Sequence, residues 1–299
     1  MILVTGATGF VGSHLVPALL EHGHKVRCLV RSPQKVQALG LRNVETVVGD
    51  ITDGKVLQEA CTGVRRVVHL VAVIRERGKY NFQSVNVEGT RKLVEAAGKG
   101  GVEHLVHLSA LGAGDDPRYR YTYSKWLGEQ AVREGKCPYT ILRPSVIFGP
   151  GFGFVDRLLQ GLKLSPGLAV IPGSGQTRFQ PVWAGDLVRC IIRVLDEGPE
   201  HYGRVYEIGG PEHLTYEEIL DAVMSEVGIR RVKVRVPLPL VKPAVRVMGL
   251  ILPDPPATPD ELAQLDRDNI TDVHSIQRTF GFKPRSFAEN LGYLKGSKQ

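Results

Sequence analysis

The chain begins with an apolar stretch that changes at once to a helical pattern. Ile2–Thr5 is a run of apolar and β-branched residues, which is typical of a buried strand. A glycine-rich segment, TGATGFVG at 5–12, follows directly. Apolar residues then recur at helical spacing at Val11, Leu15, Ala18 and Leu19. The pattern predicts a strand, a tight turn and a helix at the start of the chain.

The same alternation continues through the first half of the sequence. Apolar runs predict further strands at 25–30, 44–48, 66–71, 104–108 and 139–142, and helical patterns cover 82–99 and 119–133. Strands separated by helices of this length are joined by crossover connections and form a parallel sheet. We therefore expect a doubly wound α/β domain of the Rossmann type over 1–150, with a segment near 180–210 returning to it.

The regularity stops near Pro144. Prolines at 237, 239, 243, 253, 255, 256 and 259 are expected to break the later chain into short pieces. We interpret 151–179 and 211–299 as a smaller α/β lobe that holds a substrate or a partner.

Composition narrows the class of protein. The chain has 299 residues, an ordinary apolar fraction of 42% and a net charge of +7, which favours anionic ligands. No motif for nucleic acid is present. Four scattered cysteines, without a CxxC pair, argue against zinc and fit a reducing compartment. No leader or membrane span is recognisable, so we expect a cytoplasmic protein.

The glycine-rich turn predicts a dinucleotide site. Gly6, Gly9 and Gly12 have the spacing GxxGxxG between a strand and a helix. Glycines let the backbone approach a pyrophosphate, and the free N–H groups of the first helical turn favour its charge. The candidate contacts within this turn are Gly6, Thr8, Gly9, Phe10, Val11 and Gly12.

The end of the second strand bears on the choice of cofactor. An acidic residue there would favour NAD, but this chain has Arg31 followed by Ser32, with Lys35 close behind. A guanidinium suits a 2′-phosphate, so we predict NADP rather than NAD; a surface cation is the alternative. Asp50 and Ile51, at the end of the third strand, are expected beside the adenine, although Asp50 could instead cap the next helix.

The sequence YTYSK at 121–125 supplies the candidate chemistry. Tyr121 and Lys125 are four residues apart and share one face of a helix. A nearby ammonium lowers the pKa of a phenol, so Tyr121 would act as the acid or base while Lys125 tunes it and holds the ribose.

These segments resemble the extended short-chain dehydrogenase/reductase superfamily. TGATGFVG is similar to its cofactor loop, YTYSK to its active-site helix, and LRPSVIFGPG at 142–151 to its segment after the sixth strand. The resemblance implies an oxidoreductase or a sugar-nucleotide epimerase that acts on a hydroxyl or carbonyl group of a small molecule, such as a nucleotide sugar or another anionic compound, and a possible homodimer. It also implies cofactor contacts at Leu70, Val71, Ala72, Asn86, Leu108, Pro144 and Val146.

A narrower resemblance concerns one atypical branch. LSALGA at 108–113, RFQPV at 178–182 and LAQLDRDN at 262–269 are similar to the nucleotide-binding accessory subunit of respiratory complex I and its bacterial relatives. This likeness implies an alternative to an enzyme, namely a cofactor-stabilised assembly or sensor subunit.

One departure from the superfamily pattern affects catalysis. Active members usually have Ser or Thr just past the fifth strand, and the strand register places Ala110 there, with Ser109 one residue early. A one-residue shift along a strand points a side chain to the other face. Ser109 is therefore the weakest of the three catalytic candidates, and a lost oxyanion donor costs about 10²–10³ in rate.

Two further features have ordinary structural interpretations. His69, His104 and His107 lie on apolar strands without a carboxylate or cysteine cluster, so we expect satisfied core histidines and no metal. Basic residues between Arg230 and Arg246 surround an apolar run. This pattern is more typical of a solvated helix of the small lobe than of a surface for a membrane or a protein complex.

Overall fold

A computed structural model describes residues 1–151, 153–252 and 255–297 of the chain. The chain divides into two compact units. The first comprises Met1–Pro144 and Leu187–Glu207, and the second comprises Ser145–Asp186 and Ile208–Gln299.

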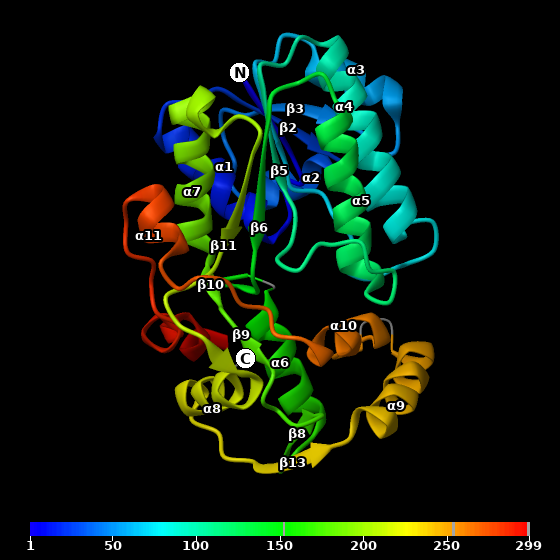
Figure 1. The fold of residues 1–299 in the computed structure, drawn as a ribbon, viewed down its shortest axis with the longest axis vertical. Helices are drawn as coiled ribbons and strands as arrows, with labels where there is room; N and C mark the ends of the chain where they lie inside the picture. Colours follow the sequence, from blue (N-terminus) through cyan, green and yellow to red (C-terminus); the bar gives the residue numbers. More distant parts are fainter. Residues whose placement is uncertain (152, 253–254, 298–299) are drawn as a thin grey trace. The chain divides into compact units, whose positions relative to one another are not determined.

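The first unit is built on a seven-stranded sheet (Figure 1). Its strands are β1 (Ile2–Thr5), β2 (Val26–Val30), β3 (Glu45–Val48), β4 (Arg66–His69), β5 (His104–Leu108), β6 (Tyr139–Pro144) and β11 (Arg204–Ile208). Their order is β11-β6-β5-β4-β1-β2-β3, and the pairs from β6 to β3 are parallel. The strand order reverses beside β1, and ligands of such sheets bind at the carboxyl ends of the strands at this point.

Helices cover both faces of this sheet. They are α1 (Phe10–Glu21), α2 (Pro33–Ala38), α3 (Gly54–Cys61), α4 (Thr90–Lys99), α5 (Arg120–Glu134), α7 (Ala184–Glu197) and a 3₁₀ turn, η2 (Gly198–His201). Figure 1 shows α3, α4 and α5 along one face and α1 and α7 along the other. A core of aliphatic side chains fills the space under α3 and α4, with Leu3, Leu57, Leu93, Leu105 and Ile141 at its centre. The α/β doubly wound fold predicted from the sequence is confirmed.

A π-helical segment, η1 (Phe82–Gly89), precedes α4 without a break. Asn81 begins it with a capping box: its side chain accepts from the Ser84 amide at 2.8 Å, and the Asn81 amide donates to Ser84 Oγ at 3.1 Å. The sequence predicts one helix over 82–99, and the first half differs only in its winding. π-Helical turns are rare and occur frequently at functional sites.

The second unit consists of shorter elements. Its strands are β7 (Ile147–Phe148), β8 (Leu168–Pro172), β9 (Arg178–Phe179), β10 (Val182–Trp183), β12 (Leu214–Thr215) and β13 (Val232–Val236), which pair two by two. Its helices are α6 (Phe154–Leu164), α8 (Tyr216–Val227), α9 (Leu238–Ile251), α10 (Pro259–Ala263) and α11 (Ser275–Phe280), with 3₁₀ turns η3 (Gln264–Asp266), η4 (Ala288–Asn290) and η5 (Gly292–Ser297). The core joins Phe148, Val155, Ile219, Val223 and Phe287.

The structure corrects one expectation for the second unit. Prolines were expected to break the chain here, yet α9 runs for 14 residues through Pro239 and Pro243. Pro239 lies in the first turn, where the amide needs no partner, and Pro243 alone removes an internal hydrogen bond. Lys233 and Arg235 of β13 form ion pairs with Glu217 of α8, so part of the basic stretch is neutralised within the unit. Within the described ranges, no helix has the length and hydropathy needed to cross a bilayer.

Three histidines lie buried in the sheet of the first unit. His69 bonds to Thr5 Oγ1 through Nδ1 at 2.7 Å and to Thr90 Oγ1 through Nε2 at 3.0 Å, while His104 Nε2 bonds to Thr140 Oγ1 at 2.8 Å. His107 differs from the expectation of a satisfied core histidine, because neither ring nitrogen has a partner in the described part of the chain. Burial lowers the pKa of His69 to about 3, that of His104 to about 4, and that of His107 well below its ordinary value.

Acid should therefore destabilise the first unit. The unfolded chain binds protons at these histidines below pH 6.5, whereas the folded chain does not. The free energy of unfolding is thus expected to fall as the pH drops from about 6.5 towards 4, by about 1.4 kcal/mol per pH unit for each histidine. Urea unfolding at several pH values measures this slope. The substitution His107→Leu should reduce it, and an identical slope in this variant would contradict the assignment.

Candidate functional site

The glycine-rich turn lies where the strand order of the sheet reverses. Gly9 is the N-cap of α1, its amide donates to the Gly6 carbonyl at 2.9 Å, and its own carbonyl accepts from the Ser13 amide at 2.9 Å. The amides of the first helical turn have no partner within a helix, and here they are those of Phe10, Val11 and Gly12. The structure thus places the predicted anion-binding residues at one helix N-terminus.

Two of the glycines are required by close contacts. A Cβ on Gly12 would lie 2.2 Å from the Gly6 carbonyl oxygen. Gly6 has a φ of 77°, and its Cβ would lie 3.0 Å from the backbone nitrogen of Val71. The turn is therefore packed against the segment after β4, which brings Leu70 and Val71 beside it.

A hollow opens next to the turn at the end of β2. It has a volume of about 310 Å³ and is lined by Thr8, Arg31, Ser32, Lys35 and Tyr80. Arg31 and Lys35 are both exposed, so the hollow carries two cations and three hydroxyl-bearing side chains near the N-terminus of α2. This donor set suits a phosphate monoester, because guanidinium and hydroxyl groups donate to its oxygens.

Tyr80 ties this hollow to the end of β3. Its hydroxyl donates to Asp50 Oδ2 at 3.1 Å, and the Arg31 guanidinium lies 4.9 Å from its ring centroid. Burial opposes ionisation of Asp50, but hydrogen bonds from Thr52 and Tyr80 and the charge of Arg31 outweigh it and lower the pKa of Asp50. Asp50 does not cap the next helix, since Asp53 caps α3 by accepting from the Lys55 amide at 3.0 Å. Ile51 is buried.

Asn86 fastens the segment after β4 to α5. Its Oδ1 accepts from the Val73 amide at 2.8 Å, and its Nδ2 donates to the Val73 carbonyl at 3.0 Å and to Ser124 Oγ at 2.9 Å. Ser124 Oγ donates in turn to the Tyr121 carbonyl at 2.6 Å. Asn86 is 1% exposed, so it acts here as a clamp that holds the loop containing Ala72 against the helix of the candidate chemistry.

Tyr121 and Lys125 lie in the first two turns of α5. The Lys125 ammonium is buried and donates to the Leu108 carbonyl at 2.7 Å. Burial lowers the pKa of Lys125 to about 8, an effect that the charge of Glu129 opposes. Burial also raises the pKa of Tyr121 to about 12, so the expected lowering by Lys125 is not seen in the protein alone.

The Ser109 hydroxyl is committed to another residue. It donates to Glu129 Oε1 at 2.6 Å, and Glu129 is also held by Arg143, whose Nε and Nη2 donate to the two carboxylate oxygens at 2.8 and 2.7 Å. The Ser109 side chain thus contacts α5, the helix that also carries Tyr121 and Lys125. Ala110, which follows it, has no hydroxyl to donate.

The remaining expected contacts lie at the end of β6. Pro144 is buried in the first unit, and its carbonyl accepts from the Leu111 amide at 2.8 Å. Val146 belongs to the second unit, where its carbonyl accepts from the Val182 amide at 2.9 Å. Sequence reasoning missed Tyr80, which carries no periodic signal, and Glu129, which the four-residue step from Lys125 could have identified.

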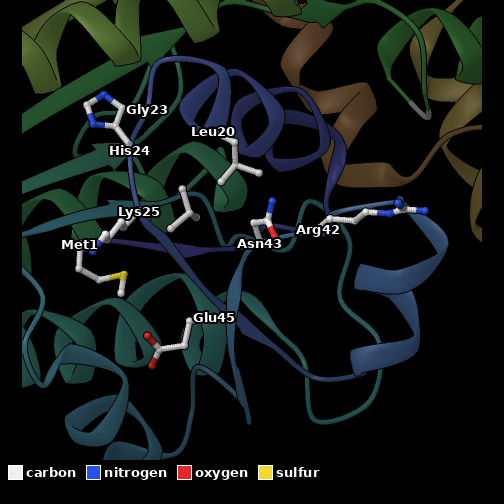
Figure 2. A pocket seen from close by; sticks show the side chains of 9 residues that line it. Met1, Leu20, Gly23, His24, Lys25, Arg42, Asn43 and Glu45 are labelled. Atoms are coloured by element: carbon white, nitrogen blue, oxygen red, sulfur yellow. The ribbon is translucent and has the colours of Figure 1, made fainter.

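A larger hollow of about 470 Å³ lies at the opposite, amino-terminal edge of the sheet (Figure 2). It is lined by Met1, Leu20, Gly23, His24, Lys25, Val26, Arg42, Asn43 and Glu45. Figure 2 shows the Arg42 side chain extending away from the others. This edge carries none of the predicted site residues, and no group of metal-ligating side chains is found among the described residues.

Comparisons with known proteins agree with this geometry. The family model for the NAD dependent epimerase/dehydratase family matches residues 2–209. The chain belongs to this family. It therefore has the NAD(P)-binding fold of these proteins, and the glycine turn lies within the matched residues.

The similar proteins in this family include a subunit of an NADH dehydrogenase and a sterol demethylase protein. NADH dehydrogenase [ubiquinone] 1 alpha subcomplex subunit 9 of Dictyostelium discoideum is 31% identical over 228 residues, which are 74% of this chain and 62% of that protein. The chain thus spans less than two thirds of that relative. Sterol demethylase protein B of Methylococcus capsulatus is 32% identical over 261 residues, covering 79% of this chain and 77% of that one.

A solved structure shares the fold of this epimerase/dehydratase family member. NADPH-dependent quinone oxidoreductase from Escherichia coli, complexed with NADPH, superposes with a TM-score of 0.78 over 98% of this chain and 99% of its own. The two sequences are 21% identical, so the likeness concerns the fold.

The close contact at Gly12 leads to a matched pair of variants. Gly12→Ala should lower the free energy of unfolding by about 1–3 kcal/mol, because the new methyl group meets backbone atoms that cannot move aside. Gly98→Ala on α4 is the control: its Cβ would lie 3.7 Å from the Lys136 Cβ, and the variant should gain about 0.5–1 kcal/mol. Thermal unfolding measures both. Equal stability of the two variants would contradict the packing described for the turn.

Proposed function

We propose that this protein is an NADP-dependent oxidoreductase that acts on a hydroxyl or carbonyl group of a small molecule. The observation that carries the proposal is the hollow at the end of β2, where Arg31, Lys35, Ser32 and Thr8 surround space beside the glycine turn. NADP differs from NAD by one phosphate on the adenosine ribose, and this hollow offers cations where that phosphate would lie.

The residues of the first unit divide the binding of NADP among them. The first turn of α1 would hold the pyrophosphate, while Asp50 and Ile51 would flank the adenine. Lys125 would hold the nicotinamide ribose, and Leu70, Val71, Ala72, Asn86, Leu108, Pro144 and Val146 would line the path towards the ring. A bound NADPH supplies a hydride.

Tyr121 would move the proton that accompanies the hydride. Its hydroxyl has no hydrogen-bond partner among the described residues, and it lies one turn before Lys125 on α5. In the protein alone its pKa is about 12, which makes the neutral phenol the stable form and suits donation to a carbonyl oxygen.

A second candidate function is a cofactor-binding subunit without turnover. The observation that favours it is that the Ser109 hydroxyl already donates to Glu129 Oε1, at 2.6 Å. The next residue, Ala110, has no hydroxyl. An oxyanion that forms near Tyr121 would lack that donor. The relative named as a subunit of NADH dehydrogenase is consistent with this function.

The cofactor preference is tested by isothermal titration. The protein should bind NADPH at least tenfold more tightly than NADH, and Arg31→Ala should remove most of this preference, because a charge-assisted hydrogen bond contributes about 1.5–3 kcal/mol. Arg42→Ala, which removes an arginine at the opposite edge of the sheet, is the matched control and should bind both cofactors as the parent does. Equal affinity of the parent for the two cofactors would contradict the NADP assignment.

Turnover decides between the enzyme and the subunit. NADPH oxidation is followed with a panel that contains a sterol ketone, a quinone and a nucleotide sugar with a keto group. The enzyme hypothesis predicts turnover of at least one compound and a loss of about 10²-fold or more in Tyr121→Phe, with unchanged NADPH affinity. Tight NADPH binding with no turnover across the panel would support the subunit instead.

A further inference from the structure

Glu129 is a fully buried acid placed one helical turn after Lys125. Its side chain is 0% exposed. Both carboxylate oxygens are held by Arg143 of β6, one of them also accepts from Ser109, and Arg133 on the same helix lies 3.8 Å from the other. A buried carboxylate is stable only with such partners, and here they hold the side chain of Glu129 in position.

Lys125 and Glu129 form hydrogen bonds with two consecutive residues at the end of β5. Lys125 Nζ donates to the carbonyl of Leu108, and Glu129 accepts from the hydroxyl of Ser109. The Ser109 amide donates to the Leu142 carbonyl of β6 at 2.7 Å, one residue before Arg143. The end of β5 is therefore attached to α5 at two points one turn apart, and the second attachment also includes β6.

Among the groups around Lys125, Glu129 is the one whose charge stabilises the protonated ammonium. His107 on β5 and His69 on β4 face it and are neutral, because burial lowers the pKa of each. Tyr121 on α5 is neutral as well. Arg143 and Arg133 are cations that bind Glu129. Burial lowers the pKa of Lys125 to about 8, and Glu129 is the group whose charge opposes this desolvation of the ammonium.

A purely structural role does not explain this arrangement well. A buried ion pair contributes little net stability compared with apolar side chains of similar size. An acid one helical turn from a buried ammonium has a second effect, because the charge of Glu129 raises the pKa of Lys125 and so favours its ionised form.

We propose that Glu129 is a positioning residue for the site: it anchors α5 to β5 and β6 through Ser109 and Arg143, and so keeps Lys125, one helical turn away, aligned. The charge of Glu129 in addition favours the protonated form of the Lys125 ammonium. Ser109 then serves this anchor and not the reacting group. The inference rests on the proposed function in so far as Lys125 holds the cofactor ribose.

The direct test is the titration of Lys125 in the protein without cofactor. Lysine is labelled with ¹³C at Cε, and its signal is assigned by its loss in Lys125→Met. In Glu129→Gln the amide oxygen can still accept from Ser109 and from Nε of Arg143, whereas the amide nitrogen cannot accept from Nη2 of Arg143. The charge is gone, so the pKa of Lys125 should fall by about one unit or more, a tenfold change in protonation. Glu134→Gln, an exposed acid at the end of the same helix, is the matched control and should leave the titration unchanged.

Two further variants keep the test informative if Glu129→Gln folds poorly. Glu129→Asp retains the charge and should titrate close to the parent. Glu129→Gln combined with Arg143→Gln removes the unpaired guanidinium and should again lower the pKa of Lys125. An unchanged Lys125 titration in a folded Glu129→Gln or in the double variant would overturn the inference.

NADPH affinity across pH separates this inference from the proposed function. In Glu129→Gln the loss of affinity at rising pH should begin at least one pH unit lower than in the parent, whereas a merely structural role would lower affinity equally at every pH. NADPH binding with an unaltered Lys125 titration would overturn the inference and leave the function intact. A shifted Lys125 titration in a protein that binds no NADPH would support the inference and contradict the proposed function.

Discussion

The close approach of the first helix to the first strand is the constraint on which the site depends. Helix α1 can begin directly after the end of β1 only because residue 12 is a glycine. Any Cβ at this position would lie 2.2 Å from the carbonyl oxygen of Gly6. The same turn is packed against Val71 after β4. A helix N-terminus is thereby held at the point where the strand order reverses, and its free amides favour a negatively charged group.

A second set of contacts fixes the chemical end of the same unit. Helix α5 is tied to β5 by Lys125 and Glu129 and to the loop after β4 by Asn86 and Ser124. Each of these contacts is buried and involves a side chain whose partners account for its polar atoms. The segment with Tyr121 is consequently held by β5 and by the loop after β4, while the hydroxyl of Tyr121 can still donate a hydrogen bond.

The pattern of apolar residues predicted the strands of the first unit well, because each strand is a short apolar run separated from the next by a helix or a turn. β5 was predicted with the bounds that it has, His104–Leu108. The winding of Phe82–Gly89 was not predictable, since eight residues do not distinguish a π-helix from an α-helix by periodicity. A helix of the small lobe was expected in the basic stretch, but not its continuation through Pro243; there Val241 and Val245 pack on Leu262 and offset the cost of the proline. For the site, strand alternation alone does not reveal the partner of Ser109: its contact with Glu129, like the contact of Tyr80 with Asp50, arises from tertiary structure. The contacts assigned to the cofactor remain predictions.

The most direct measurement is a crystal structure of the protein grown with NADPH. The account predicts the pyrophosphate on the amides of Phe10 and Val11, with the 2′-phosphate in the hollow between Arg31 and Lys35. A nucleotide bound elsewhere, or a 2′-phosphate that faces solvent away from Arg31, would contradict it.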